Sequence, residues 1–118
     1  MSQAYDRNRL VELFGGDAAT LAEIEREFLD MARGAQVEIR GTDDLETIAR
    51  AAHRVKGASG MIGALALGGV ADAVERAARA RDLAGVRGLG EALAREVARV
   101  AAQAGADQAR GLSITVAE

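Results

Sequence analysis

The stretch GTDDLETIARAAHRVKGASGMIGA, residues 41–64, has the spacing of a helix with one buried face. Its apolar residues recur at intervals of three, four and seven, which places them on one side of an α-helix: Leu45, Ile48, Ala52, Val55 and Ile62. Thr42 or Asp43 can cap the start of this helix. The glycines from Gly60 to Gly63 are expected to end it. A helix with a single apolar face must pack against other elements of the chain.

The same spacing recurs along the chain and predicts further helices at about residues 6–14, 17–39, 65–81 and 83–104. The chain has no proline, which would interrupt such helices. We therefore expect an all-α fold, an antiparallel up-down-up-down four-helix bundle with a short N-terminal helix. Residues 1–106 would form this domain, and residues 107–118, which end in LSITVAE, would be a flexible C-terminal tail.

The composition indicates one domain with an aliphatic core. The chain has 118 residues, of which 49% are apolar and only 3% aromatic. Its net charge of −3 gives no reason to expect nucleic acid or an anionic membrane as a partner. It has no cysteine, its N-terminus does not resemble a signal peptide, and no apolar segment approaches the roughly 20 residues that span a bilayer. We therefore expect a cytoplasmic protein.

His53 is the only histidine, and helical geometry places it opposite the apolar face of its helix. Residues three, four and seven positions away share its surface: Glu46, Ala49, Arg50, Lys56, Gly57 and Gly60. A glycine inside a helix costs about 1 kcal/mol relative to alanine. Gly57 and Gly60 would in return leave the imidazole open to a large partner. The residues therefore predict an exposed and accessible ring.

An exposed imidazole flanked by cations suits the transient capture of a phosphoryl group. Neutral imidazole is a nucleophile near neutral pH, and Lys56 and Arg50 favour an anion attached to it. The chain lacks a glycine-rich phosphate loop, so it offers no site for ATP. A single histidine among scattered carboxylates also lacks the spacing of a metal site. From the residues alone, a surface histidine without a function remains an open alternative.

Residues 53–64, His-Arg-Val-Lys-Gly-Ala-Ser-Gly-Met-Ile-Gly-Ala, resemble the signature of the histidine-containing phosphotransfer (HPt) domain family. The family pattern continues into a helix with an acidic or amide residue, and here Glu75 follows Leu67, Val70 and Val74. LVELFGGD, residues 10–17, and the helix around Phe28 are similar to the family's N-terminal part. The resemblance implies a four-helix bundle whose His53 accepts a phosphoryl group from an aspartate of a response-regulator receiver domain, or returns it.

The resemblance also implies roles for individual residues. Lys56 would help to hold the phosphoryl oxygens, Gly57 would admit the receiver domain, and Glu75 would hydrogen-bond the imidazole and fix its tautomer. The receiver domain would supply Mg²⁺, so the chain would need no cofactor of its own, and a sensor histidine kinase would act upstream. Ala58 departs from the serine that is common in the family. Arg54 replaces an aliphatic residue and can contribute to partner choice.

Two alternatives remain open at this point. The chain could be a helical adaptor that binds a receiver or a kinase without phosphotransfer, or it could be an excised phosphotransfer domain of a larger sensor kinase. For Glu75, the alternative to a contact with His53 is a solvated ion pair with Arg79, four residues later on the same helix.

Overall fold

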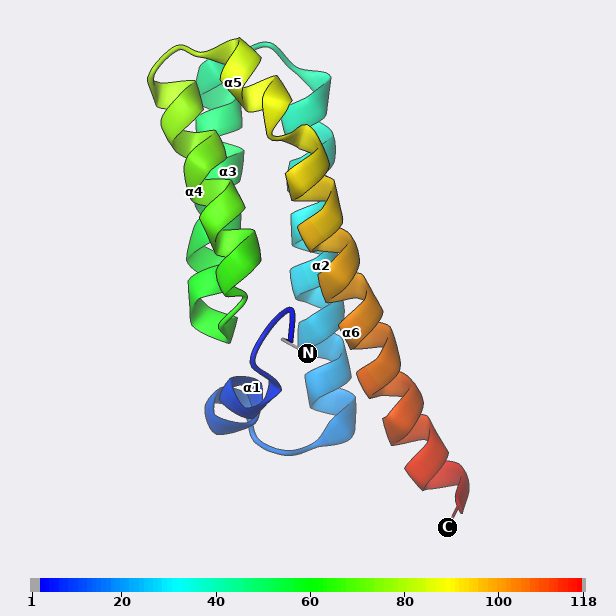
Figure 1. The fold of residues 1–118 in the computed structure, drawn as a ribbon. Helices are drawn as coiled ribbons and strands as arrows, with labels where there is room; N and C mark the ends of the chain where they lie inside the picture. Colours follow the sequence, from blue (N-terminus) through cyan, green and yellow to red (C-terminus); the bar gives the residue numbers. More distant parts are fainter. Residues whose placement is uncertain (1–2, 118) are drawn as a thin grey trace.

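The computed structural model describes residues 3–117 and the side chains of residues 3–109. Within this range all regular structure is helical, in the order α1 (Arg7–Phe14), α2 (Ala18–Gly41), α3 (Leu45–Ile62), α4 (Leu65–Arg79), α5 (Leu83–Gly88) and α6 (Gly90–Ala117). The all-α fold class is therefore confirmed. Figure 1 shows the four long helices packed lengthwise, with α1 at one end of the molecule and α5 at the other.

Aspartates define where most of the helices begin. A carboxylate accepts a hydrogen bond from a backbone N–H of the first turn in three helices, α1, α2 and α5, at Asp6, Asp17 and Asp82. The cap of α3 is Asp44, one residue later than the latest expected position. The hydroxyl oxygen of Thr42 instead accepts a hydrogen bond from the backbone N–H of Asp44, at 3.1 Å. This turn delays the start of α3.

The apolar faces predicted from the spacing meet in one core. α3 contacts α2 and α4, and α6 also contacts α2 and α4, so the four long helices enclose a common interior. The largest fully buried side chains of these helices are aliphatic: Leu21, Ile48, Leu67 and Leu93. Burial of each contributes about 1.5–3 kcal/mol to folding. Leu45, the first residue of the α3 stripe, is only partly buried.

α1 lies beside the turn between α3 and α4 (Figure 1). The backbone N–H of Asp6 donates a hydrogen bond to the carbonyl oxygen of Ile62, at 2.9 Å. Gly63 ends α3 with φ at +69°, in the left-handed region that favours glycine. A Cβ at Gly63 would lie 2.8 Å from the Cβ of Asp6. Gly63 therefore both stops α3, as expected, and allows the N-terminal segment to pass close to the turn.

A buried polar cluster joins the N-terminal segment to α2 and α6. The hydroxyl of Tyr5 donates a hydrogen bond to the carboxylate of Glu25 and lies 3.2 Å from Oδ2 of Asp107. Nη1 of Arg7 lies 3.5 Å from a carboxylate oxygen of each acid. Gln103 also exchanges hydrogen bonds with the backbone N–H and carbonyl of Tyr5. We call Tyr5, Arg7, Glu25 and Asp107 the buried acid cluster.

The C-terminal part differs from the single helix predicted over residues 83–104. A turn at Leu89 separates α5 from α6. Three glycines, expected only to weaken this helix, surround the break: Gly85, Gly88 and Gly90. Arg87 fastens α5 to the α2–α3 connection, because its guanidinium donates to the carbonyl oxygens of Ile39 and Thr42, at 2.8 and 2.6 Å. α4 also ends two residues earlier than expected, at Arg79.

α6 continues past Ala104, where we expected its end, to Ala117. Gly105 and Gly111 lie within the helix and do not stop it. Asp107, the first residue of the expected tail, is buried. The side chains of residues 110–118, to which most of the expectation of a flexible tail applies, lie outside the described residues. Over residues 3–117, no helix is both long enough and apolar enough to cross a membrane.

Candidate functional site

His53 lies on the outer face of α3, with its side chain 66% exposed. The opposite face of the helix anchors it, since Ile48, Ala52 and Val55 are buried in the core. The orientation predicted from helical spacing is the one that the structure has. An imidazole on a well-packed helix has a fixed position while its ring remains open to solvent.

Glu75 of α4 faces His53 across the groove between the two helices. Its Oε2 lies 3.1 Å from Nδ1 of His53. An ionised carboxylate can only accept hydrogen bonds, so Nδ1 carries the proton in this contact. The lone pair of the neutral ring is then on Nε2, the nitrogen that does not contact Glu75. The geometry therefore leaves Nε2 as the nucleophilic atom.

The carboxylate of Glu75 is buried and is held in its ionised form by a cation. Arg79 donates from Nε and Nη2 to Oε2 of Glu75, at 3.0 and 2.8 Å. These hydrogen bonds, followed by the interaction with His53, lower the pKa of Glu75 below its ordinary value. The ion pair with Arg79 was the alternative to a contact with His53 in the sequence analysis. The structure contains both.

Lys56 lies one turn after His53, and its ammonium group is already paired with carboxylates of α4. Its Nζ lies 2.9 Å from Oδ1 of Asp72 and 3.7 Å from Oε1 of Glu75. The hydrogen bond and charge of Asp72 raise the pKa of Lys56, and Lys56 in turn lowers the pKa of Asp72. Sequence reasoning missed Asp72, although its position three residues before Glu75 places both acids on one face of α4.

Gly57 and Gly60 are exposed on the same surface as His53. A Cβ built at either position would meet no atom within 4 Å, apart from its neighbours in the helix. Nothing in the protein's own packing therefore requires glycine there. Because these glycines carry no side chain, the surface around the imidazole is unobstructed, as the approach of a macromolecule would require.

The other residues expected on the His53 surface divide into two groups. Glu46 and Arg50 are exposed, and Arg54 is exposed while donating to Glu38 of α2 at 3.0 Å. Ala49 is only 3% exposed, so its assignment to a partner-binding surface was wrong. Ala49 lies four residues before His53, further around the helix, where it lines a hollow between the start of α3 and the end of α4.

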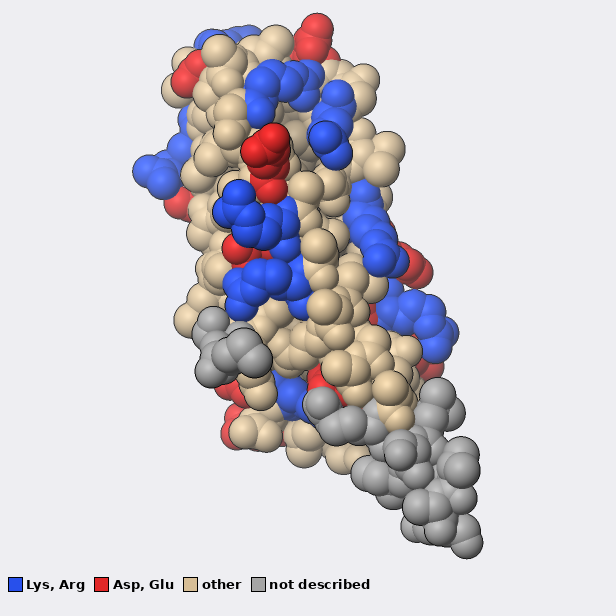
Figure 2. Space-filling model, turned by 45° about the vertical axis from the view of Figure 1, so that its right-hand side comes forward, with Lys and Arg blue, Asp and Glu red and all other residues tan. Residues whose placement is uncertain are grey.

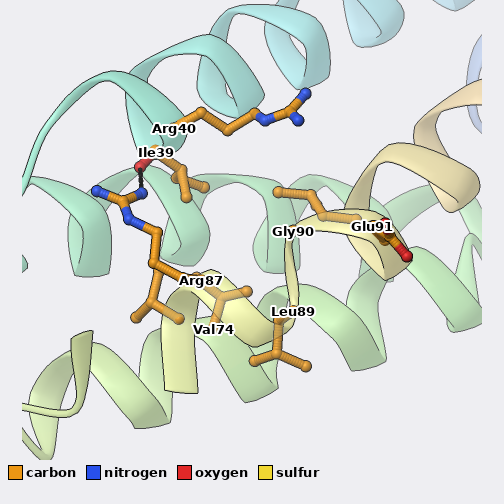
Figure 3. A pocket seen from close by; sticks show the side chains of 9 residues that line it. Ile39, Arg40, Val74, Arg87, Leu89, Gly90 and Glu91 are labelled. Atoms are coloured by element: carbon orange, nitrogen blue, oxygen red, sulfur yellow. Dashed lines mark hydrogen bonds between the residues drawn. The ribbon is translucent and has the colours of Figure 1, made fainter. Parts of the chain in front are cut away.

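Among the described residues, the surface is hollowed at the end of the molecule where α3 begins and α4 ends. One hollow of about 310 Å³ lies between the start of α3 and the end of α4, next to the site, and Glu46 and Arg79 line it. Another of about 220 Å³ lies under α5, and Figure 3 shows its lining, with Arg87 donating to Ile39 and with Val74 and Leu89 alongside. None of the residues that surround His53 lines the hollow under α5.

The surface carries both signs of charge. Figure 2, turned to bring the right-hand side of Figure 1 forward, shows Lys and Arg side chains intermixed with Asp and Glu side chains. In the His53 groove the same mixture is organised into pairs, since Lys56 and Arg76 contact Asp72 and Arg79 contacts Glu75. The site therefore combines an exposed imidazole, a buried carboxylate and several cations within one network of contacts.

The sequence matches the model of a known protein family. The family described as the Hpt domain matches residues 9–103, which is most of the chain and includes every residue of the His53 site. Neither the curated proteins nor the solved structures contain a significant match.

Proposed function

Because the chain belongs to the Hpt domain family, we propose that it is a phosphorelay intermediate in which His53 accepts a phosphoryl group from an aspartate of a response-regulator receiver domain and donates it to another. The contact between Nδ1 of His53 and Glu75 carries this proposal. It leaves Nε2 unprotonated on an exposed ring, which is the state that a nucleophile needs.

The transfer requires no proton movement by this chain. Nε2 attacks the phosphorus of the aspartyl phosphate, the new N–P bond forms, and the O–P bond breaks to release the aspartate carboxylate. The proton on Nδ1 stays where it is, so the phosphorylated ring carries a positive charge. The ionised Glu75 compensates that charge at 3.1 Å. Lys56, on the same helix face, would attract the phosphoryl oxygens. The reverse reaction follows the same steps backwards.

The chain supplies the nucleophile, and the partner supplies the rest of the reaction centre. Mg²⁺ would come with the receiver domain and neutralise phosphoryl charge there. The receiver would dock over Gly57 and Gly60, with Arg54, Arg50 and Glu46 at the margin of the contact. A sensor histidine kinase would act upstream, and the protein would work in the cytoplasm.

We also propose that the four long helices run antiparallel, in up-down-up-down order. The connection between α3 and α4 consists of Gly63 and Ala64 alone, and so short a link joins neighbouring helices of opposite direction. This arrangement brings His53 and Glu75, which are 22 positions apart, to the same level of the bundle.

Transfer from a phosphorylated receiver domain tests the proposal. The wild-type protein should acquire an acid-labile label, and His53→Gln should abolish it without loss of helical structure, measured by circular dichroism. Receivers of the source organism would be assayed in parallel. If His53→Gln is still labelled, His53 is not the acceptor. If receivers bind but none transfers phosphate to the wild type, the adaptor function replaces the proposal.

A glycine pair tests the docking surface. Gly57→Leu should slow transfer about ten-fold or more, because a bulky side chain beside the ring separates the reacting atoms. Gly34→Leu is the matched control, since Gly34 is also exposed within a helix and a Cβ there meets nothing within 4 Å. Both variants should unfold at similar temperatures. Equal transfer rates for both would exclude a receiver contact at Gly57.

A further inference from the structure

Asp72 is placed between two cations of the His53 groove. Its Oδ1 lies 2.9 Å from Nζ of Lys56, and its Oδ2 lies 3.1 Å from Nε of Arg76. Neither the sequence motif nor the family match assigns it a role. In this structure the cation expected to bind the phosphoryl group is therefore already paired with a carboxylate.

We propose that Asp72 is a competing counter-ion, which holds Lys56 while His53 is unphosphorylated and loses it to the phosphoryl group when His53 is phosphorylated. This inference rests on the proposed function. It makes Asp72 a positioning residue that acts through Lys56, with no contact of its own to the reacting atoms.

The geometry permits this exchange. The side chain of Lys56 is partly exposed. Its ammonium group ends a flexible four-carbon chain and can therefore move between neighbouring acceptors. Exposed ion pairs are weak, whereas a phosphoryl group offers up to two negative charges and three oxygens. Asp72 would not be left unpaired by the exchange, because Arg76 contacts its other oxygen. Glu75, 3.7 Å from Nζ, keeps the ammonium close to the ring in either state.

The exchange has a consequence for the direction of transfer. When the phosphoryl group leaves His53, Lys56 returns to Asp72, so the recovered ion pair favours donation over retention. A variant without the carboxylate should therefore load more readily and retain the phosphoryl group longer. The effect should be about two- to five-fold, as expected for a partly exposed ion pair.

Chemical phosphorylation tests the inference without a partner protein. Phosphoramidate donates its phosphoryl group as Nε2 forms the new N–P bond, the donor's N–P bond breaks and ammonia leaves. The loading rate and the half-life of phosphohistidine, followed by ³¹P NMR, should both rise about two- to five-fold in Asp72→Asn. Asp72→Glu, which keeps the carboxylate, should stay close to the wild type. Asp30→Asn, which removes an exposed acid from α2, is the control for net charge.

The coupling to Lys56 separates this role from a structural one. In a Lys56→Met background, Asp72→Asn should change neither rate, because there is no ammonium left to compete for. An effect of Asp72→Asn equal to that of Asp30→Asn, or one that persists without Lys56, would overturn the inference. A wild-type protein that phosphoramidate labels no better than His53→Gln would instead overturn the proposed function. The two failures are thus distinguishable.

Discussion

Glu75 and Glu25 are both buried glutamates, only 7% and 4% exposed, yet their pKa values move in opposite directions. Glu75 stands in the exposed groove beside His53 and has a lowered pKa. Glu25 stands in the buried acid cluster and has a raised pKa. Burial alone would raise both, because it disfavours the charged form. The difference therefore comes from the groups that each carboxylate contacts.

The partners of Glu75 are cations and hydrogen-bond donors. Oε2 accepts from Arg79 at 2.8 and 3.0 Å and contacts His53 at 3.1 Å. Glu25 has one hydroxyl donor, Tyr5, and shares its surroundings with a second carboxylate, Asp107. Burial is the main cause of its raised pKa, and the hydrogen bond and charge of Asp107 add to it. The hydrogen bond from Tyr5 is the main influence that lowers the pKa of Glu25, and Arg7, at 3.5 Å, adds a smaller one.

The comparison separates an acid held among cations, Glu75, from an acid held beside another carboxylate, Glu25. Under the proposed function, Glu75 must remain ionised to compensate a positively charged phosphohistidine, and its hydrogen bonds from Arg79 support the ionised form. An acid that joins the N-terminal segment to α2 and α6 can share a proton with its neighbour. Substitution of Glu75 is therefore expected to slow phosphotransfer, whereas the same substitution of Glu25 is expected to leave phosphotransfer unchanged.

Among the substitutions that compare the two glutamates, Glu75→Ala should have the largest effect on phosphotransfer. Without the carboxylate, the tautomer of His53 is no longer fixed and the charge on the phosphorylated ring is uncompensated. Loss of a group that orients a metal-binding histidine costs roughly 10- to 100-fold, and we expect a loss in the upper part of that range for His53. Glu75→Gln, which can still accept from Nδ1 but has no charge, should lie between this variant and the wild type. Transfer rates from a phosphorylated receiver domain measure both.

Glu25→Gln is the matched control for Glu75→Gln. It makes the same isosteric change in the buried acid cluster, so transfer should remain at the wild-type rate. Equal slowing by the two substitutions would mean that both act through the stability of the bundle, and the distinction between the two acids would be lost.

The sequence predicted the helices well because their signal is local. Apolar spacing located the buried face of α3, and that face placed His53 outward; Gly63 ended the helix as expected. Ala49 was misassigned because a helical wheel does not show how closely α4 packs. The predicted end of α6 was wrong because a helix that packs against its neighbours tolerates a glycine such as Gly105 in its interior.

Contacts between distant residues were the part that local patterns could not provide. The meeting of Glu75 with His53 was expected from the family resemblance, not from spacing. Asp72 carried no signal apart from its place on the face of Glu75. The buried acid cluster joins Tyr5 to Asp107, which are 102 positions apart. Nothing in the sequence near either residue indicates the other.

The smallest expected effect concerns stability and pH. The folded-state pKa of Glu25 lies above the value of about 4.3 in an unfolded chain. The folded protein therefore binds more protons than the unfolded chain, and this group makes stability fall as pH rises from about 4.3 through its folded pKa. Glu25→Gln cannot ionise, while its amide can still accept from Tyr5 and donate to Asp107. It should gain stability over the wild type as pH rises, by about 1 kcal/mol at neutral pH.

Glu75→Gln should give the opposite slope. Its lowered pKa means that Glu75 contributes stability above about pH 4.3 and loses that contribution as pH falls through the folded value. The variant should therefore lose stability relative to the wild type at neutral pH and match it in acid. Urea unfolding at a series of pH values measures both differences, and subtracting the wild-type curve removes the other acids. Two difference curves that slope in the same direction would show that burial, rather than the contacted groups, governs both glutamates.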